Sequence, residues 1–143
     1  MSEHNFAVSV VTPDGIVYEY DTATLVVLNT TSGEVGVMAN HVPIISALRI
    51  DEARVIDSAN DLKKSLAING GFAEFSDNKL TIVGDSAELA DQIDLRRAES
   101  ARQRAERRLR EAQTDVDAQD HDMDRLQVAL RRAVNRIHVA DGK

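Results

Sequence analysis

The amino-acid sequence changes character at Gly84-Asp85, and this boundary constrains the fold more than any single residue does. Upstream of it, short apolar and β-branched runs alternate with turn residues. Downstream of it, the chain is rich in Ala, Arg and Glu and has no glycine until Gly142. A run of strands followed by a run of helix is typical of a segregated α+β architecture. We therefore predict an all-β domain over residues 1–85 and a helical domain over residues 86–143.

Charge is divided unequally between the two parts. Residues 1–85 carry 12 acidic and 5 basic side chains, whereas residues 86–143 carry 12 of each. An acidic β domain argues against nucleic acid as the main partner. The absence of cysteine excludes a disulfide framework, and no apolar run approaches the roughly 18 residues of a membrane span. We expect a soluble protein without a signal peptide.

The first part of the chain has the pattern of short, half-buried strands. Phe6, Val8 and Val10 alternate with Ala7, Ser9 and Val11, and Pro13-Asp14-Gly15 then forms a turn. Similar apolar runs predict strands at residues 16–20, 24–28, 35–38, 44–48, 53–56, 65–68, 72–75 and 80–83, with turns at 57–60, 69–71 and 76–79. Short strands with a turn roughly every 8–12 residues indicate a sandwich or a barrel. We favour a β-sandwich.

One polar cluster lies between Gly33 and Pro43. His41 has the chemistry of a metal ligand or a general base, but no second histidine lies at ligand spacing and no partner completes a triad. We therefore favour a structural role for His41 in a loop. Gly33 and Gly36 flank Glu34 and permit a tight loop that presents its charge to a partner.

The second part of the chain has the pattern of two helices. Asp85 and Glu88 have the spacing of a capping box, which predicts a helix start. Two one-sided apolar stripes follow, separated by an acidic link at residues 115–122; they comprise Ala98, Ala101, Ala105, Leu109, Ala112 and Val116, then Met123, Leu126, Leu130, Ala133 and Ile137. This arrangement predicts an antiparallel helical hairpin. Its alanine seam stabilises weakly, since a buried CH₂ contributes only about 0.8 kcal/mol.

Four arginines are spaced so that they converge in such a hairpin. Arg97 and Arg104 lie seven residues apart on the first helix, and Arg132 and Arg136 lie four apart on the second. Antiparallel packing places the two pairs roughly level. Planar guanidinium groups suit phosphate oxygens.

Two interpretations of the arginines remain open at this point. The first is a solvated charged face, supported by pairs four residues apart such as Arg102–Glu106 and Glu106–Arg110. The second is a polyphosphate site. The sequence has no Gly-rich P-loop, so we expect a nucleotide there to be bound rather than hydrolysed.

Taken together, the motifs resemble those of the epsilon subunit family of bacterial F-type ATP synthases, over essentially the whole chain. The segments that carry the resemblance are VVTPDG at 10–15, GEVG at 33–36, NHVP at 40–43, SLAI at 65–68 with GGF at 70–72, IDLRRA at 93–98, and ALRRA at 129–133 with NR at 135–136. The family's fold is a β-sandwich followed by a helical hairpin, which agrees with the fold predicted above.

The resemblance implies a non-catalytic subunit of the rotating central stalk, peripheral to the cytoplasmic face of the bacterial cell membrane. Such a subunit packs against the gamma subunit and the ring of c subunits, and it couples proton-driven rotation to ATP synthesis. Glu34 and His41 match the family's ring-contact positions. The hairpin either folds on the sandwich or extends toward the alpha and beta subunits, where it restrains ATP hydrolysis.

The resemblance also implies a regulatory ATP site. Some bacterial members bind ATP on the folded hairpin through an Ile/Leu-Asp-x-x-Arg-Ala motif, which corresponds here to Ile93, Asp94, Arg97 and Ala98. The family's other nucleotide positions correspond to Glu88, Arg104, Arg132 and Arg136. No catalytic residue, metal or required cofactor is implied.

The sequence departs from the family pattern at two places. Ala39 stands where many members have proline, so we expect a looser ring-facing loop. The acidic link at 118–122 alters how an extended tail meets its acidic partner surface. Two other function classes remain as alternatives, a free-standing adaptor with a helix-docking hairpin and a small hydrolase built around His41 or the arginines.

Overall fold

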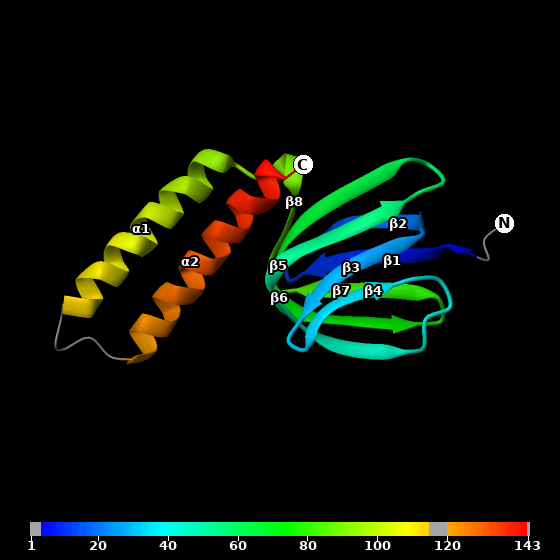
Figure 1. The fold of residues 1–143 in the computed structure, drawn as a ribbon, viewed down its shortest axis with the longest axis horizontal. Coiled ribbons are helices and arrows are strands. Elements are labelled where there is room, and N and C mark those ends of the chain that lie inside the picture. The colour runs from blue at the N-terminus through cyan, green and yellow to red at the C-terminus, as the bar shows by residue number, and fades with distance from the viewer. Residues whose placement is uncertain (1–3, 115–119, 143) are drawn as a thin grey trace.

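The computed structural model consists of a β-sandwich with a helical hairpin at one end (Figure 1). It describes residues 4–114 and 120–142. The strands over these residues are β1 (Phe6–Thr12), β2 (Gly15–Ala23), β3 (Leu25–Thr30), β4 (Gly33–Val37), β5 (Ile44–Asp57), β6 (Leu62–Ser76), β7 (Lys79–Gly84) and β8 (Ala87–Leu89). A 3₁₀ turn, η2 (Ala90–Gln92), leads to the helices α1 (Leu95–Thr114) and α2 (Asp120–Asp141). The predicted segregated fold is confirmed.

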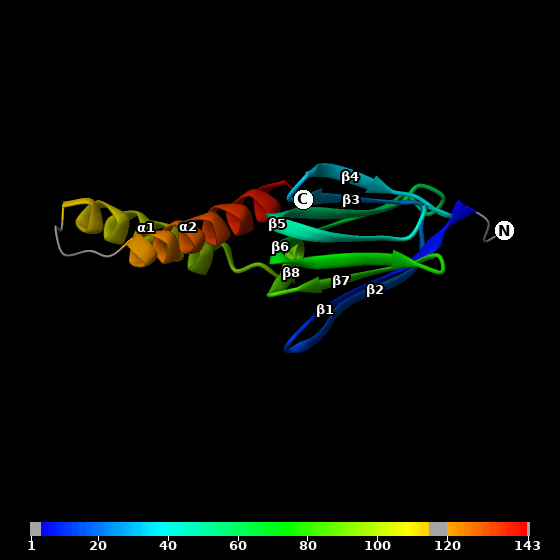
Figure 2. The ribbon, with the colours of Figure 1, turned by 90° about the horizontal axis from the view of Figure 1, so that it is seen from below.

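The sandwich arises because one continuous sheet folds over on itself. The strand order is β2-β1-β7-β6-β5-β3-β4, and β8 pairs with β6 outside this path. Strands β5 and β6 are 14 and 15 residues long and pair along their whole length. β3 and β4 extend the sheet on one side, while β7, β1 and β2 extend it on the other and form the second layer (Figure 2).

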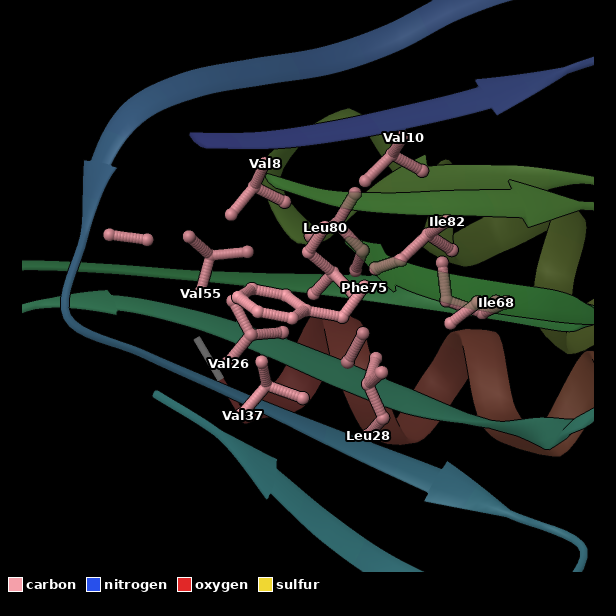
Figure 3. Close-up of a cluster of buried hydrophobic side chains, with 14 of the residues drawn as sticks. Val8, Val10, Val26, Leu28, Val37, Val55, Ile68, Phe75, Leu80 and Ile82 are labelled. Carbon is pink, nitrogen blue, oxygen red and sulfur yellow. The ribbon is translucent and has the colours of Figure 1, made fainter. Parts of the chain in front are cut away.

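The strand alternation observed in the sequence produces the core of the sandwich. Phe6, Val8 and Val10 are at most 2% exposed, as the alternation predicts. The ring of Phe6 packs edge-to-face on that of Phe75, with 5.6 Å between centroids. Branched side chains from both layers surround Phe75 (Figure 3). Full burial of each such side chain contributes about 1.5–3 kcal/mol, so this core holds the two layers together.

The sequence predicted an interruption within β5 and another within β6, but each of them is one long strand. The sequence predicted separate strands at 44–48 and 53–56 and a turn at residues 69–71. Instead, the β5–β6 pairing keeps the same register from Leu48↔Gly71 to Ile50↔Asn69. Gly70 and Gly71 have positive φ angles of 87° and 121°. A Cβ at residue 71 would lie 2.0 Å from the Val83 carbonyl oxygen, so these glycines permit a bend and a close approach of β7 rather than a hairpin turn.

The β5–β6 turn is organised by a buried carboxylate. Asp57 is 1% exposed, and its Oδ2 accepts hydrogen bonds from Tyr20 Oη at 2.6 Å and Thr22 Oγ1 at 2.8 Å. The side-chain amide of Asn60 donates to the same oxygen at 2.7 Å. The hydrogen bond from Tyr20, followed by that from Asn60, holds the pKa of Asp57 well below its usual 3.8. The carboxylate therefore connects β2 to the β5–β6 hairpin.

We expect Asp57→Ala to lower the melting temperature by about 5–10 °C, because the side-chain donors of Tyr20, Thr22 and Asn60 lose their acceptor. The folded pKa of Asp57 lies below the unfolded value, so the stability that the carboxylate contributes is present above about pH 4 and is lost as the pH falls toward the folded pKa. The difference in melting temperature between Asp57→Ala and the native protein should therefore shrink below pH 3.8, the usual Asp pKa. Calorimetry at a series of pH values measures this difference. Asp14→Ala, in the exposed β1–β2 turn, is the control; an equal loss there would contradict the prediction.

The predicted capping box at Asp85 and Glu88 is wrong. Residues 87–89 form β8, which pairs with β6 through Leu66↔Leu89 and Ile68↔Ala87. Helix α1 begins later, at Leu95, where the Asp94 Oδ1 accepts a hydrogen bond from the Arg97 backbone N–H at 3.2 Å. Pairing with a sheet edge overrides the local capping signal, since β8 completes backbone hydrogen bonds of β6.

The two helices pack through the predicted alanine seam. Ala98, Ala105 and Ala133 are at most 4% exposed. The C-terminal end of α2 then reaches the sandwich, where Val139 and Ala140 pack with Ala67, Ala90 and Ile93. The predicted link at 115–122, and with it Val116, lies largely outside the described residues. The apolar contact between hairpin and sandwich is therefore small, and three of its five buried side chains are alanines.

Candidate functional site

A cavity of about 590 Å³ lies between the sandwich and the hairpin. This volume is within the usual range of small-molecule sites, roughly 300–1,000 Å³. Its lining residues come from both parts of the chain: Asn69, Ser86 and Glu88 from the sandwich side, and Arg96, Arg97, Ser100, Ala101, Arg104, Arg132 and Arg136 from the two helices. A ligand in this cavity would touch both parts at once.

The helical wall of the cavity is strongly basic. Arg96, Arg97 and Arg104 come from α1, and Arg132 and Arg136 come from α2. This confirms that antiparallel packing brings the two arginine pairs together. Of these five arginines, Arg136 alone makes an ion pair with another described residue. Several unneutralised guanidinium groups around one cavity create a site suited to a polyanion.

The sandwich contributes a carboxylate to the same cavity. Glu88 Oε1 lies 2.7 Å from Arg136 Nε, and Arg136 Nη2 donates to Glu88 Oε2 at 3.3 Å. These side chains are only 33% and 21% exposed, respectively, so water screens the pair less than it screens a surface pair. The ion pair joins β8 to α2. The hairpin therefore contacts the sandwich through this polar pair as well as through the small apolar cluster at the end of α2.

Three of the eight sequence-predicted nucleotide residues do not line the cavity. Ile93 is 9% exposed and packs against the end of α2, and Asp94 caps α1. Ala98 is fully buried in the helix seam. These three residues of the motif position α1 and so hold Arg97 at the cavity. The other five, Glu88, Arg97, Arg104, Arg132 and Arg136, line it directly.

Five lining residues were not predicted from the sequence. Arg96 lies within the predicted motif, and Ser100 and Ala101 follow it at helical spacing from Arg97 and Arg104. Asn69 and Ser86 carry no local signal, because only the strand pairing brings β6 and the β7–β8 connection to the hairpin. Their contribution is a pair of neutral hydrogen-bonding side chains opposite the arginines.

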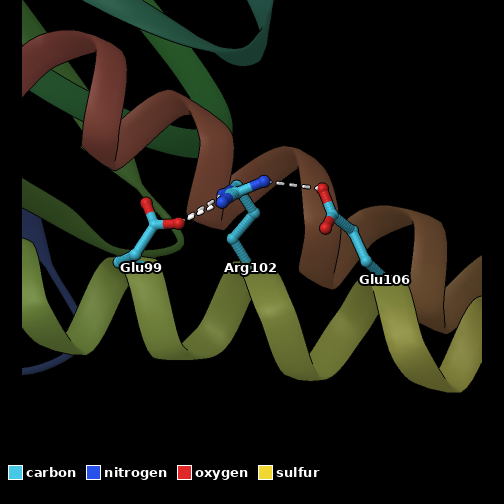
Figure 4. A network of polar contacts seen from close by, with 3 residues as sticks. All are labelled: Glu99, Arg102 and Glu106. Atoms are coloured by element: carbon cyan, nitrogen blue, oxygen red, sulfur yellow. Dashed lines mark hydrogen bonds and ion pairs between the residues drawn. The ribbon is translucent and has the colours of Figure 1, made fainter.

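Arg102 fits the other interpretation, that of a solvated charged face. Arg102 does not line the cavity; it forms ion pairs with Glu99 and, at 2.9 Å, with Glu106 (Figure 4). The hydrogen bond from Arg102 lowers the pKa of Glu99 below its usual value. These groups are about one-third exposed, so they support helix α1 only modestly. Carboxylates of its own helix thus neutralise Arg102, whereas four of the five cavity arginines make no ion pair among the described residues.

The two predicted partner-contact residues lie at opposite ends of β4. Glu34 pairs with Asn29 in the β3–β4 ladder, and its carboxylate is 4.0 Å from Arg54 Nη2. His41 lies in the β4–β5 loop, where its Nδ1 is 2.7 Å from the Val42 carbonyl oxygen and its ring meets that of Phe75 edge-on. The two side chains therefore do not share one loop.

The β4–β5 loop is tied to other parts of the sandwich by side-chain contacts. Ala39 packs against the core, and the Asn40 backbone N–H donates to Asn78 Oδ1 at 2.8 Å. Asn78 Nδ2 in turn donates to the Asn5 carbonyl oxygen at 2.9 Å. The side chain of Asn78 thus ties this loop to the residue before β1.

The arrangement supports binding rather than chemistry. Within the part of the chain that the structure describes, no cluster of three or more His, Asp or Glu side chains is placed to hold a metal ion. Among residues 4–114 and 120–142, no helix has both the length and the apolarity that a membrane crossing demands. The cavity offers guanidinium groups, hydroxyls and an amide, which bind anions and hydrogen-bonding groups.

Comparison with known proteins agrees with this architecture. Residues 5–90 match the family described as ATP synthase, Delta/Epsilon chain, beta-sandwich domain, and residues 91–141 match ATP synthase, Delta/Epsilon chain, long alpha-helix domain. The chain is 50% identical over 141 residues to the ATP synthase epsilon chain of Pediococcus pentosaceus, a match that covers 98% of this chain and 99% of that one. It is 52% identical over 134 residues to the ATP synthase epsilon chain of Levilactobacillus brevis, covering 94% and 93% of the two chains.

Two solved structures share the fold at low sequence identity. A chain of the Euglena gracilis mitochondrial ATP synthase, OSCP/F1/c-ring, aligns with a TM-score of 0.74 at 19% identity, over 92% of this chain and 78% of that one. A chain of the Tetrahymena thermophila mitochondrial ATP synthase, central stalk/c-ring, aligns with a TM-score of 0.53 at 11% identity, over 99% and 98%. The fold, the two family matches and the close relatives agree, and the chain belongs to the delta/epsilon chain family of ATP synthases as a bacterial F-type epsilon chain, a non-catalytic subunit of that complex.

Proposed function

We propose that the chain is a central-stalk subunit that couples proton-driven rotation to ATP synthesis and uses its hairpin as an ATP-sensitive restraint on ATP hydrolysis. The sandwich would bind the gamma subunit and the c ring, and the extended hairpin would reach the alpha and beta subunits. In this role the protein is peripheral to the cytoplasmic face of the bacterial membrane. The low-identity structural relatives come from F1/c-ring and central stalk/c-ring assemblies, which supports the proposed location.

The observation that carries the ATP proposal is the basic cavity between the two parts of the chain. Its cationic wall belongs to the hairpin, and its other wall belongs to the sandwich. A polyphosphate bound there would favour the folded hairpin, because extension would separate the two walls. The site has no P-loop, so the ligand would act by binding and would not be hydrolysed.

The weak packing of the hairpin makes such control energetically reasonable. Alanines dominate the buried seam, and the contact with the sandwich consists of a small apolar cluster and the Glu88–Arg136 pair. A ligand at 100 times its Kd stabilises the state that binds it by about 2.7 kcal/mol. This amount is comparable to the burial of one or two large apolar side chains, and is sufficient to bias a marginal element.

A surface suited to partner binding extends from the β4–β5 loop onto β5 and β6. Met38 and Val42, beside His41, are 60% and 68% exposed, and Ile45 and Phe72 on neighbouring strands are 74% and 46% exposed. Exposed apolar side chains gathered on one region mark interaction surfaces. This supports attachment of the sandwich to the stalk. A free-standing adaptor predicts instead a soluble complex without ATP synthase subunits, which a pull-down would reveal.

The test of the ATP proposal is a calorimetric titration of the full chain with ATP. Saturable binding is expected, and Arg132→Ala should weaken it by about 10- to 100-fold, because charge-assisted hydrogen bonds to phosphate are lost. Arg107→Ala is the matched control, since Arg107 is an exposed arginine on α1 that does not line the cavity. Absent binding, or an equal loss in both variants, would contradict the proposal.

A further inference from the structure

Asn135 is a polar side chain that α2 buries where the hairpin meets the sandwich. It is 7% exposed, and its Nδ2 is a buried donor with no acceptor among the described residues. In water such an amide would be hydrogen-bonded, so its burial without a partner costs free energy. The folded position of the hairpin therefore carries a cost at this residue.

The helical repeat directs Asn135 at the sheet. Val139 lies one turn further along the same face of α2 and packs with Ala67 of β6. On one side of this face, Arg136 lines the basic cavity beside β8; on the other side, Arg131 lines a separate cavity against β5. Asn135 lies between these two arginines around the helix, so its amide is enclosed between α2 and the β5–β6 pair.

The sandwich also buries an unpartnered atom at this contact. Asn69 lies two residues after Ala67, on the same face of β6, and its Oδ1 is buried with no donor among the described residues. Its Nδ2 donates to Ser86 Oγ at 2.6 Å, and its backbone N–H donates to the Ser86 carbonyl oxygen at 3.0 Å, so the amide is held in place. The folded hairpin thus leaves one buried donor and one buried acceptor unpaired. Both would regain hydrogen bonds to water when α2 leaves the sheet.

We propose that Asn135 keeps the hairpin releasable, because its buried amide weakens the contact enough for α2 to leave the sandwich. The attractive part of the contact is small, since it consists of five buried apolar side chains and the Glu88–Arg136 pair. An unsatisfied buried donor shifts such an equilibrium by about 5- to 100-fold toward the state in which water satisfies it. This inference rests on the proposed function in one respect, the movement of the hairpin, and it requires neither ATP nor the arginines of the cavity.

The experiment measures how often the contact opens, from the reactivity of a thiol buried in it. The chain has no cysteine, so Val139→Cys introduces a single thiol at a position that is 0% exposed and packed against the sandwich. A thiol reagent added to the full chain reaches this sulfur only when α2 leaves the sheet. Asn135→Leu replaces the amide by an apolar side chain of similar shape and should slow the reaction about 5- to 50-fold. Asn135→Ala, which adds no atoms, should slow it less.

Gln127→Leu and Gln127→Ala are the matched controls, since Gln127 is an exposed amide on the same helix and should leave the reaction rate unchanged. Val55→Cys, at a position that is 0% exposed in the sandwich core, reports unfolding of the sandwich and should react equally fast in all these backgrounds. A slower reaction at residue 139 in either Asn135 variant, without a change at residue 55, supports the inference. An unchanged or faster reaction in both variants would overturn it.

The assembled enzyme separates this inference from the proposed function. Asn135→Leu should make it hydrolyse ATP faster than the native enzyme, because the hairpin extends less often toward the alpha and beta subunits. If thiol labelling slows but hydrolysis is unchanged, Asn135 controls release as inferred, and the restraint on hydrolysis that the proposed function gives to the hairpin is wrong. If labelling does not slow, the inference fails, whereas ATP binding that Arg132→Ala weakens would still support the proposed function.

Discussion

Gly71→Ala is expected to destabilise the sandwich by more than about 4 kcal/mol, which would leave little folded protein at 37 °C. Two costs add. The φ of +121° is unfavourable for any residue with a Cβ, and the added methyl would lie 2.0 Å from the Val83 carbonyl oxygen. Because that oxygen belongs to the backbone of β7, relief requires separation of β6 and β7. Urea unfolding followed by circular dichroism measures the loss.

Gly33→Ala separates the two costs. Gly33 has nearly the same φ, +124°, but a Cβ there would meet nothing within 4 Å. We expect this variant to lose only about 1–2 kcal/mol, from backbone strain alone. If the two variants were equally stable, the close approach of β6 and β7 would not matter energetically, and our explanation of the bend would be wrong.

A chain that ends after Asp94 should keep the sandwich and lose ATP binding altogether. It retains β8 and η2 but lacks every arginine of the cavity. Under the proposed function, it should still assemble with the gamma subunit and the c ring. The assembled enzyme should then hydrolyse ATP faster than enzyme with the full chain, because no hairpin can extend toward the alpha and beta subunits. Co-purification and ATPase assays measure both effects.

The matched comparison is a chain that ends after Gly84, which also lacks β8. Removal of β8 exposes the backbone of β6 at Leu66–Ile68 and the side chains of Leu66 and Ile68, now at most 2% exposed. We expect this chain to aggregate or unfold, since an uncovered apolar strand edge invites non-native pairing. Gamma binding by this chain but not by the longer one would refute the structural role given to β8.

Helical spacing alone predicted that four arginines of the cavity lie close together. Arg97, Arg104, Arg132 and Arg136 follow periodicities of three to four residues, and one assumption of antiparallel packing brings the two pairs together. The structure places all four around one cavity. Spacing could not distinguish these arginines from Arg102, which the neighbouring carboxylates Glu99 and Glu106 neutralise. Whether a charge is free or paired depends on rotamers and neighbours, which sequence periodicity does not contain.

The sequence by itself determined the features that depend on neighbours along the chain. Alternation at Phe6, Val8 and Val10 specifies buried strand faces, and the alanine stripe specifies the helix seam. Only the tertiary structure decided which of the predicted turns and helix starts actually form. Gly70-Gly71 became a bend because β5 holds the register on both sides, and Asp85 to Glu88 became a connection and strand because β6 offers an unpaired edge. Asn69 reaches the arginines for the same reason: hydrogen bonds between distant strands outweigh local preferences of tenths of a kcal/mol to about 1 kcal/mol per residue.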